Sequence, residues 1–159
     1  MNIKRAGRDW TGIRMTIAAL DLGRRRIGVA VTDAASMGAY PVGIVERRAL
    51  KMDLEAIAAM LRDRRVSTIV VGLPLNMDGS EGPAALSARK FAASIADALG
   101  VTVEMFDERL TSFEARERLA DMPARKGARK RGIDALAAVV ILEGWMQANP
   151  DKIPRGGGG

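Results

Sequence analysis

The chain has 159 residues, of which 48% are hydrophobic and 28% charged, a composition typical of one soluble globular domain. It contains no histidine and no cysteine, which excludes Ser-His-Asp and Cys-His nucleophilic sites, zinc sites built on either residue, disulfides and thiol redox chemistry. Any metal must therefore be held by oxygen ligands, which favours Mg²⁺, Mn²⁺ or Ca²⁺. The net charge of +6 favours a polyanionic partner.

Three segments are expected along the chain. Residues 1–15 are predicted to form a basic, flexible arm, residues 16–149 one domain, and residues 150–159 a flexible glycine-rich tail. Met15 stands directly before the first apolar run, so translation can begin there or at Met1. No run of 18 apolar residues and no secretory leader is present, which predicts a cytoplasmic protein without a membrane span.

The hydrophobic pattern predicts five strands and four helices. The short apolar runs that indicate strands cover residues 16–21, 27–32, 40–46, 66–73 and 101–106. The helical segments lie around residues 54–61 and 88–99, after a capping box at Thr111-x-x-Glu114, and over residues 133–145, with a basic loop before the last of them. The order βββαβαβαα predicts a three-layer α/β domain with a mixed five-stranded sheet and helices on both faces.

Carboxylates stand at three places in this predicted fold. Asp21 closes the first strand, Asp107 and Glu108 close the fifth, and Asp134 falls on an otherwise apolar stripe of the last helix. Each has a structural alternative: Asp21 can cap a tight turn, the strand-end pair can complement a helix N-terminus, and Asp134 can bind free amides in the first helical turn. The strand register decides whether Asp107 or Glu108 faces a site, and sequence alone leaves both open.

Taken together, the three positions fit a single cleft. Three carboxylates so close repel one another unless divalent cations neutralise them. Two cations bridged by carboxylates are a common arrangement for phosphodiester hydrolysis, and this chemistry needs no histidine. Basic clusters next to two of the acids would then hold phosphates, although such clusters are also typical of solvated loops; they comprise Arg24, Arg25, Arg26, Arg125, Lys126, Arg129, Lys130 and Arg131.

The segment from Gly72 to Pro83 follows a strand and leads into a helix. This position allows backbone amides to bind a phosphate, but no Walker A sequence is present and an ordinary crossover loop explains the segment equally well. Its polar residues of undecided role are Asn76, Asp78, Ser80 and Glu81.

Four segments together, residues 21–30, 71–82, 107–112 and 133–138, resemble the YqgF family of RuvX-like bacterial proteins, which are regarded as Holliday junction resolvases and pre-16S rRNA nucleases. The resemblance implies a ribonuclease H-like fold and a cytoplasmic nuclease that uses Mg²⁺ or Mn²⁺. It favours the 5′ end of pre-16S rRNA, in ribosomal precursor particles, as substrate, with branched DNA as the alternative.

The resemblance also implies roles for individual residues. Asp21, Glu108 and Asp134 would be the catalytic, metal-binding acids, with Asp107 as the alternate, and Arg109 would join the basic clusters in binding nucleic acid. Resolvase-type relatives place their second acid at the end of the fourth strand, where this chain reads Gly72-Leu73-Pro74. Glu108 must therefore supply that carboxylate from the neighbouring strand, or the metal site is depleted.

Two other classes of function stay open at this level. One is a nucleic-acid or ribosome-assembly protein that binds without cutting. The other is an ATPase related to actin or sugar kinases, since those proteins also begin with Asp-x-Gly at a strand end. The second is weaker, because such enzymes build their cleft from two domains and this chain has room for one. The oligomeric state is not predicted.

Overall fold

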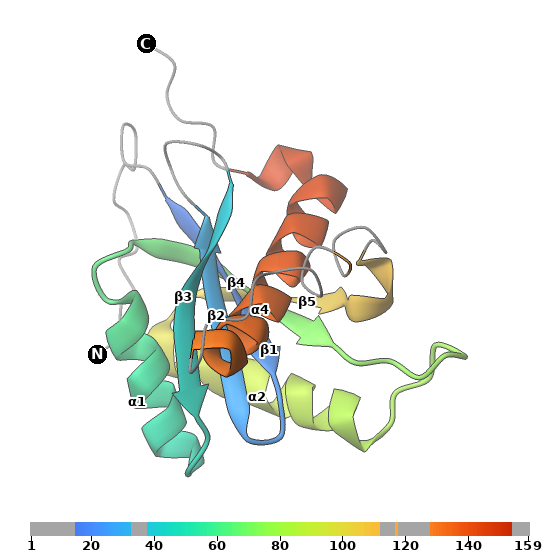
Figure 1. Cartoon of the computed structure of the whole chain (residues 1–159), viewed down its shortest axis with the longest axis horizontal. Helices are drawn as coiled ribbons and strands as arrows, with labels where there is room; N and C mark the ends of the chain where they lie inside the picture. The colour runs from blue at the N-terminus through green and yellow to red at the C-terminus, as the bar shows by residue number, and fades with distance from the viewer. Residues whose placement is uncertain (1–14, 33–37, 112–116, 118–127, 154–159) are drawn as a thin grey trace.

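The computed structural model describes residues 15–32, 38–111, 117 and 128–153, and for 128–134 the backbone alone. A five-stranded sheet in the order β3-β2-β1-β4-β5 forms its centre (Figure 1). β1 pairs antiparallel with β2, which pairs antiparallel with β3, whereas β4 runs parallel to both β1 and β5. The strands are β1 (Thr16–Leu22), β2 (Arg26–Thr32), β3 (Ala39–Glu46), β4 (Val66–Leu73) and β5 (Thr102–Asp107). The predicted mixed sheet is confirmed.

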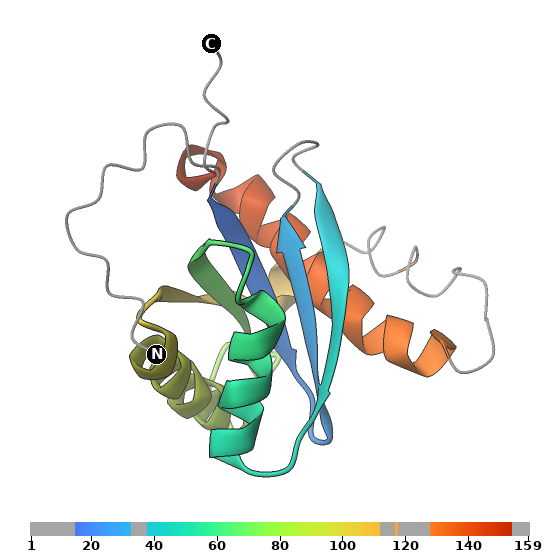
Figure 2. The same ribbon diagram turned by 90° about the vertical axis from the view of Figure 1, so that its left-hand side faces the viewer.

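Helices cover both faces of the sheet, as the βββαβαβαα order predicts. Helices α1 (Leu50–Leu61) and α2 (Pro83–Leu99) pack on one face, and α4 (Ala128–Ala148) crosses the other (Figure 2). α2 ends at Gly100, whose φ of 65° is the left-handed conformation that glycine adopts readily at a helix end. The architecture is therefore the expected three-layer α/β domain.

Two hydrophobic clusters hold the layers together, one on each face of the sheet. Ala18 and Leu20 of β1 belong to the cluster under α1 and α2, and Ile17 and Ala19 belong to the cluster under α4. Because side chains alternate between the faces of a strand, Asp21 continues the α4 side. The acid at the end of β1 thus faces the layer that contains α4.

The last helix begins earlier than the sequence pattern predicts. α4 starts at Ala128, so Arg129, Lys130 and Arg131 belong to its backbone and not to a basic loop. Alanine, arginine and lysine favour helices, which explains the extension. Asp134 therefore lies beyond the first turn, and the alternative that it binds the free amides there is wrong. The helix predicted from the capping box at Thr111-x-x-Glu114 falls mostly outside the described residues.

The described fold continues past the predicted domain end at residue 149. Residues Pro150–Lys152 form a 3₁₀ helix, η2, and Ile153 packs against the cluster under α4. The Lys152 ammonium lies 2.7 Å from the Glu104 carboxylate of β5. These contacts hold residues 150–153 against the rest of the domain. No helix in the described part of the chain is long and apolar enough to cross a membrane.

Candidate active site

The parallel strands β1, β4 and β5 end at the same edge of the sheet, the carboxyl edge. Leu22, Leu73 and Asp107 are their last residues. The turn between β1 and β2 lies at this edge as well, because it follows the end of β1. In open α/β sheets this edge is where ligands gather. The predicted acids Asp21 and Glu108 therefore lie at the edge where a site is expected.

Glu108 lies directly over Gly72, the residue before the end of β4. A Cβ atom added to Gly72 would collide with Glu108 Oε1 and would lie 3.1 Å from Glu108 Cγ and 2.7 Å from Ile141 Cδ1 of α4. The Glu108 carboxylate thus takes the space that a side chain on β4 would fill, on the face covered by α4. Glycine at position 72 makes this placement possible, since any side chain there would displace the carboxylate.

Asp21 lies beside this position. Leu20 pairs with Val71, so one step further along the two parallel strands Asp21 is next to Gly72. On its other side Asp21 pairs with Gly28 of β2. Both strand neighbours of Asp21 therefore lack a side chain. Asp21 and Glu108 share the α4 face of the sheet, with glycines on either side of Asp21.

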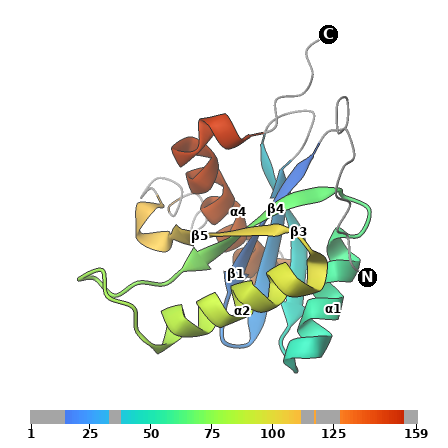
Figure 3. The same cartoon turned by 180° about the vertical axis from the view of Figure 1, so that it is seen from behind.

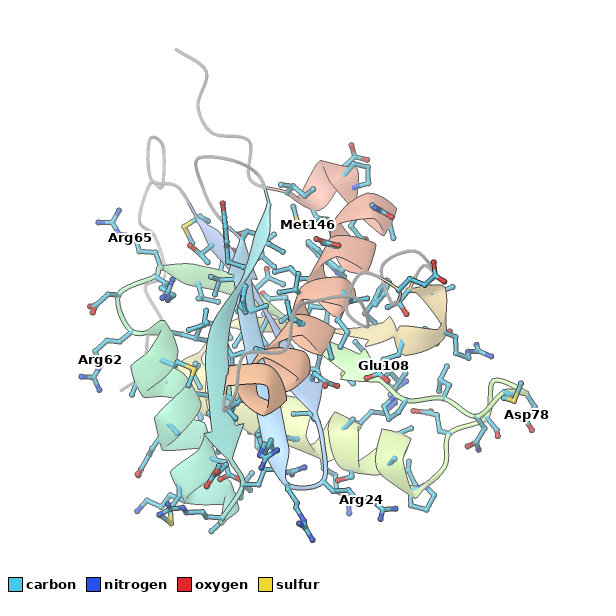
Figure 4. All side chains as sticks on the ribbon, viewed as in Figure 1. Arg24, Arg62, Arg65, Asp78, Glu108 and Met146 are labelled. Carbon is cyan, nitrogen blue, oxygen red and sulfur yellow. The ribbon has the colours of Figure 1, made fainter. Side chains whose placement is uncertain are left out.

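The carboxylate of Asp107 binds Arg109. This carboxylate accepts hydrogen bonds from the Arg109 guanidinium, at 3.1 Å from Nε and 2.8 Å from Nη2, and a further one from the Arg109 backbone N–H at 2.9 Å. The hydrogen bonds from the Arg109 side chain hold the pKa of Asp107 below its usual value. Glu108, and not the alternate Asp107, is thus the strand-end acid placed over Gly72 on the α4 face (Figure 4).

Arg109 also contacts the loop between β4 and α2. Its Nη1 atom donates to the Met77 carbonyl at 3.4 Å, and Nη1 would lie 3.7 Å from a Cβ atom on Gly79. Arg109, which is predicted to bind nucleic acid, also joins two parts of the protein through its guanidinium. Of the loop residues of undecided role, Glu81 forms an ion pair with Arg89 of α2, and the other three hydrogen-bond one another, as described below.

The arginines of the β1–β2 turn line a hollow at the same edge. Arg24 and Arg25 are exposed, and the hollow of about 320 Å³ is bounded by Arg24, Arg25, Arg26, Glu46 and Arg47. Arg47 holds the turn in place, because its Nη1 donates to the Gly23 carbonyl at 2.8 Å and its guanidinium lies 5.5 Å from the centroid of the Phe91 ring. Sequence reasoning missed Arg47, which no motif marks.

Asp53 of α1 contacts Arg47 and the backbone of Arg48. Its side chain is buried, accepts a hydrogen bond from the Arg48 N–H at 2.9 Å, and lies 4.0 Å from Arg47 Nε. We expect Asp53→Ala to lower the free energy of unfolding by about 2 kcal/mol, because it leaves a partly buried N–H without an acceptor. Urea denaturation measures the change. Asp63→Ala, at an exposed position after α1, should change it by less than about 0.5 kcal/mol, and equal losses in the two variants would contradict the role given to Asp53.

The donor set at the carboxyl edge suits a hard divalent cation. Asp21 and Glu108 offer carboxylate oxygens, the ligands that Mg²⁺ and Mn²⁺ prefer. Within the described residues no group of three acids forms a metal cluster, and the side chain of Asp134 lies outside them. The side chains of Arg125, Lys126, Arg129, Lys130 and Arg131 are likewise not described.

Comparison with known proteins decides the family. The family model RuvX, described as Holliday junction resolvase, matches residues 15–148. The chain belongs to the RuvX family. A relative from Anaeromyxobacter sp. (strain Fw109-5), named "Putative pre-16S rRNA nuclease", is 51% identical over 132 residues, covering 83% of this chain and 96% of the relative. A relative of the same name from Myxococcus xanthus is 46% identical, covering 85% and 89%. The resemblance seen in the four motifs is confirmed.

Solved structures support the fold of this RuvX protein. Thermus thermophilus RuvC superposes with a TM-score of 0.51 at 17% identity, covering 85% of this chain and 97% of RuvC. A fowlpox virus resolvase, in a structure with Holliday junction DNA, gives a TM-score of 0.50 at 12% identity, covering 84% and 98%. The expected ribonuclease H-like class is confirmed. With the family match, these findings make the RuvX protein a phosphodiester hydrolase.

Proposed function

We propose that this RuvX protein is a divalent-metal-dependent nuclease of the cytoplasm that processes the 5′ end of pre-16S rRNA. The observation that carries the proposal is the position of Glu108 over Gly72, next to Asp21 on the α4 face. Asp21 and Glu108, together with Asp134 of α4, would hold Mg²⁺ or Mn²⁺ in the proposed site. Glu108, the residue after β5, would supply the acid that resolvase-type relatives carry on the fourth strand.

The protein's own residues have distinct tasks in this reaction. When bound, divalent cations stabilise the charge that develops during phosphodiester hydrolysis. The three acids would hold the cations, and the glycine at position 72 lets the Glu108 carboxylate lie beside Asp21. The exposed Arg24 and Arg25, which follow Asp21 in the next turn, bind the phosphates that flank the scissile bond.

Pre-rRNA is the favoured substrate because the similar proteins from Anaeromyxobacter and Myxococcus are named for it. Ribosomal precursor particles are the corresponding partner. Branched DNA is the second candidate, supported by the description of the family model. Phosphate contacts alone do not distinguish the two nucleic acids, so the substrate needs a direct test.

The test compares cleavage of two labelled substrates with Mg²⁺ or Mn²⁺: an RNA spanning the 5′ leader and start of 16S rRNA, and a four-way DNA junction. Asp21→Asn and Asp134→Asn are run beside Asp97→Asn, which removes an exposed charge on α2. We expect metal-dependent cleavage of the RNA, lost in the first two variants and kept in the third.

Three outcomes would contradict the proposal in different ways. Cleavage unaffected by Asp21→Asn and Asp134→Asn would reject the carboxylate site. Cleavage of the junction alone would replace RNA by branched DNA. Binding without cleavage under either metal would favour a protein that binds nucleic acid without cutting it.

A further inference from the structure

The loop between β4 and α2 projects from the body of the molecule and presents an apolar side chain at its end. Figures 1 and 3 show this segment extending away from the sheet, and Figure 4 shows Asp78 at its tip. Met77, the preceding residue, is 99% exposed, the largest exposure among the exposed large hydrophobic residues of the described chain. Its neighbours Asn76, Asp78, Gly79 and Ser80 are polar or small. An exposed apolar side chain therefore stands among polar or small neighbours in the chain.

The tip of the loop is held by hydrogen bonds. The Gly79 N–H donates to the Asn76 carbonyl at 2.9 Å, and the Asn76 N–H donates to the Ser80 carbonyl at 2.9 Å. The Asp78 carboxylate accepts from both the N–H and the hydroxyl of Ser80, which lowers the pKa of Asp78 below its usual value. Gly79 has a φ of 86°, which a side chain would strain. The exposure of Met77 is thus built into the fold of the loop.

Arg109 joins this tip to the candidate active site. Its guanidinium binds the Asp107 carboxylate and donates to the Met77 carbonyl, and its neighbour in the chain is Glu108. The Coulombic attraction of Arg109 also contributes to the lowered pKa of Asp78. Arg109 therefore links the backbone at Met77 to the residue that precedes Glu108 in the chain.

We propose that Met77 packs against the face of an unpaired nucleobase in the substrate, next to the strand that is cut. A thioether makes favourable contacts with aromatic rings, and methionine is among the apolar residues that proteins insert at base steps. A base inside a continuous duplex has both faces covered by its neighbours, so only an unpaired or branched strand offers a free face. A single apolar side chain among polar residues suits one flat ring better than a protein surface, which would need a wider apolar patch.

This proposal rests on the proposed nuclease function, and it adds a preference for unpaired strands. The test measures binding by fluorescence anisotropy without added divalent metal, so that cleavage does not interfere. The ligands are an RNA hairpin with an unpaired 5′ extension and the same hairpin with the extension paired to a complementary strand. The variants are Met77→Ala, Met77→Leu and, as a matched control, Met52→Ala, which alters an exposed methionine of α1.

We expect the wild type to prefer the unpaired extension. Met77→Ala should lose about 2- to 12-fold in affinity for that ligand alone, the range that corresponds to one sulfur–ring contact. Met77→Leu should keep most of the preference and Met52→Ala all of it. An unchanged preference in Met77→Ala, or equal weakening of both ligands, would overturn the role of Met77. A wild type that binds neither ligand would overturn the role of Met77, and one that also fails to cleave the pre-rRNA substrate with Mg²⁺ or Mn²⁺ would overturn the proposed function as well.

Discussion

Glu108→Gln should lower the rate of phosphodiester cleavage by at least about 100-fold. The substitution keeps the size of the side chain over Gly72 and removes only the charge that would hold a divalent cation. Even residues that merely orient a metal ligand cost 10- to 100-fold when they are replaced, so loss of a ligand itself should cost more. Single-turnover cleavage of the labelled pre-rRNA substrate at saturating Mn²⁺ measures the effect.

Two other acids serve as comparisons for Glu108. Asp107→Asn changes the adjacent residue, whose carboxylate binds Arg109, and should cost much less than Glu108→Gln. Asp97→Asn removes a charge from the exposed surface of α2 and should leave the rate unchanged. If Asp107→Asn were the damaging substitution and Glu108→Gln the mild one, the assignment of the strand-end acid would be reversed.

Gly72→Ala should lower the rate by about 100-fold although it removes no functional group. The added methyl group would collide with Glu108 Oε1 and would also crowd Ile141, so the carboxylate must move. Displacement of a reacting group by about 1 Å can cost about 100-fold in rate. The same cleavage assay, repeated at increasing Mn²⁺ concentration, measures both the rate and the metal requirement, and a weaker response to Mn²⁺ is expected.

A loss of stability must be separated from this effect. Gly100→Ala places a methyl group at a left-handed position at the far end of α2, where it should lower the melting temperature without lowering the rate. Gly72→Ala with a normal rate and a normal Mn²⁺ response would show that Glu108 does not need the space over Gly72.

The order of the elements and the layers of the fold could be predicted because the hydrophobic pattern encodes them. Residues 66–73 were predicted as a strand and form β4, since a continuous apolar run between polar segments is typical of a strand covered on both faces. The start of α4 was missed by five residues, because the pattern marks only the part of a helix that packs on the sheet. Arg129 and Lys130 extend α4 through their helix propensity, without an apolar face.

The acids of the candidate site could be predicted from the sequence, but their positions relative to one another could not. The choice between Asp107 and Glu108 depends on register and on the chain's turn into η1 (Glu108–Leu110), which no local pattern specifies. Gly72 stands at the end of the strand where resolvase-type relatives carry an acid. That this glycine leaves space for the Glu108 side chain is visible only in three dimensions. Met77 lies in a segment that carries the family resemblance, but its exposure is visible only in the structure, because no local pattern shows whether a methionine in a polar loop points outward.

The double variant Asp21→Asn/Glu108→Gln gives the most direct test that the two acids act in one metal site. Its cleavage rate with Mn²⁺ should equal that of the slower single variant, because residues that act as a unit are strongly non-additive when they are replaced together. Losses that multiply in the double variant would show that Asp21 and Glu108 act independently, and this result would contradict a shared site at the carboxyl edge.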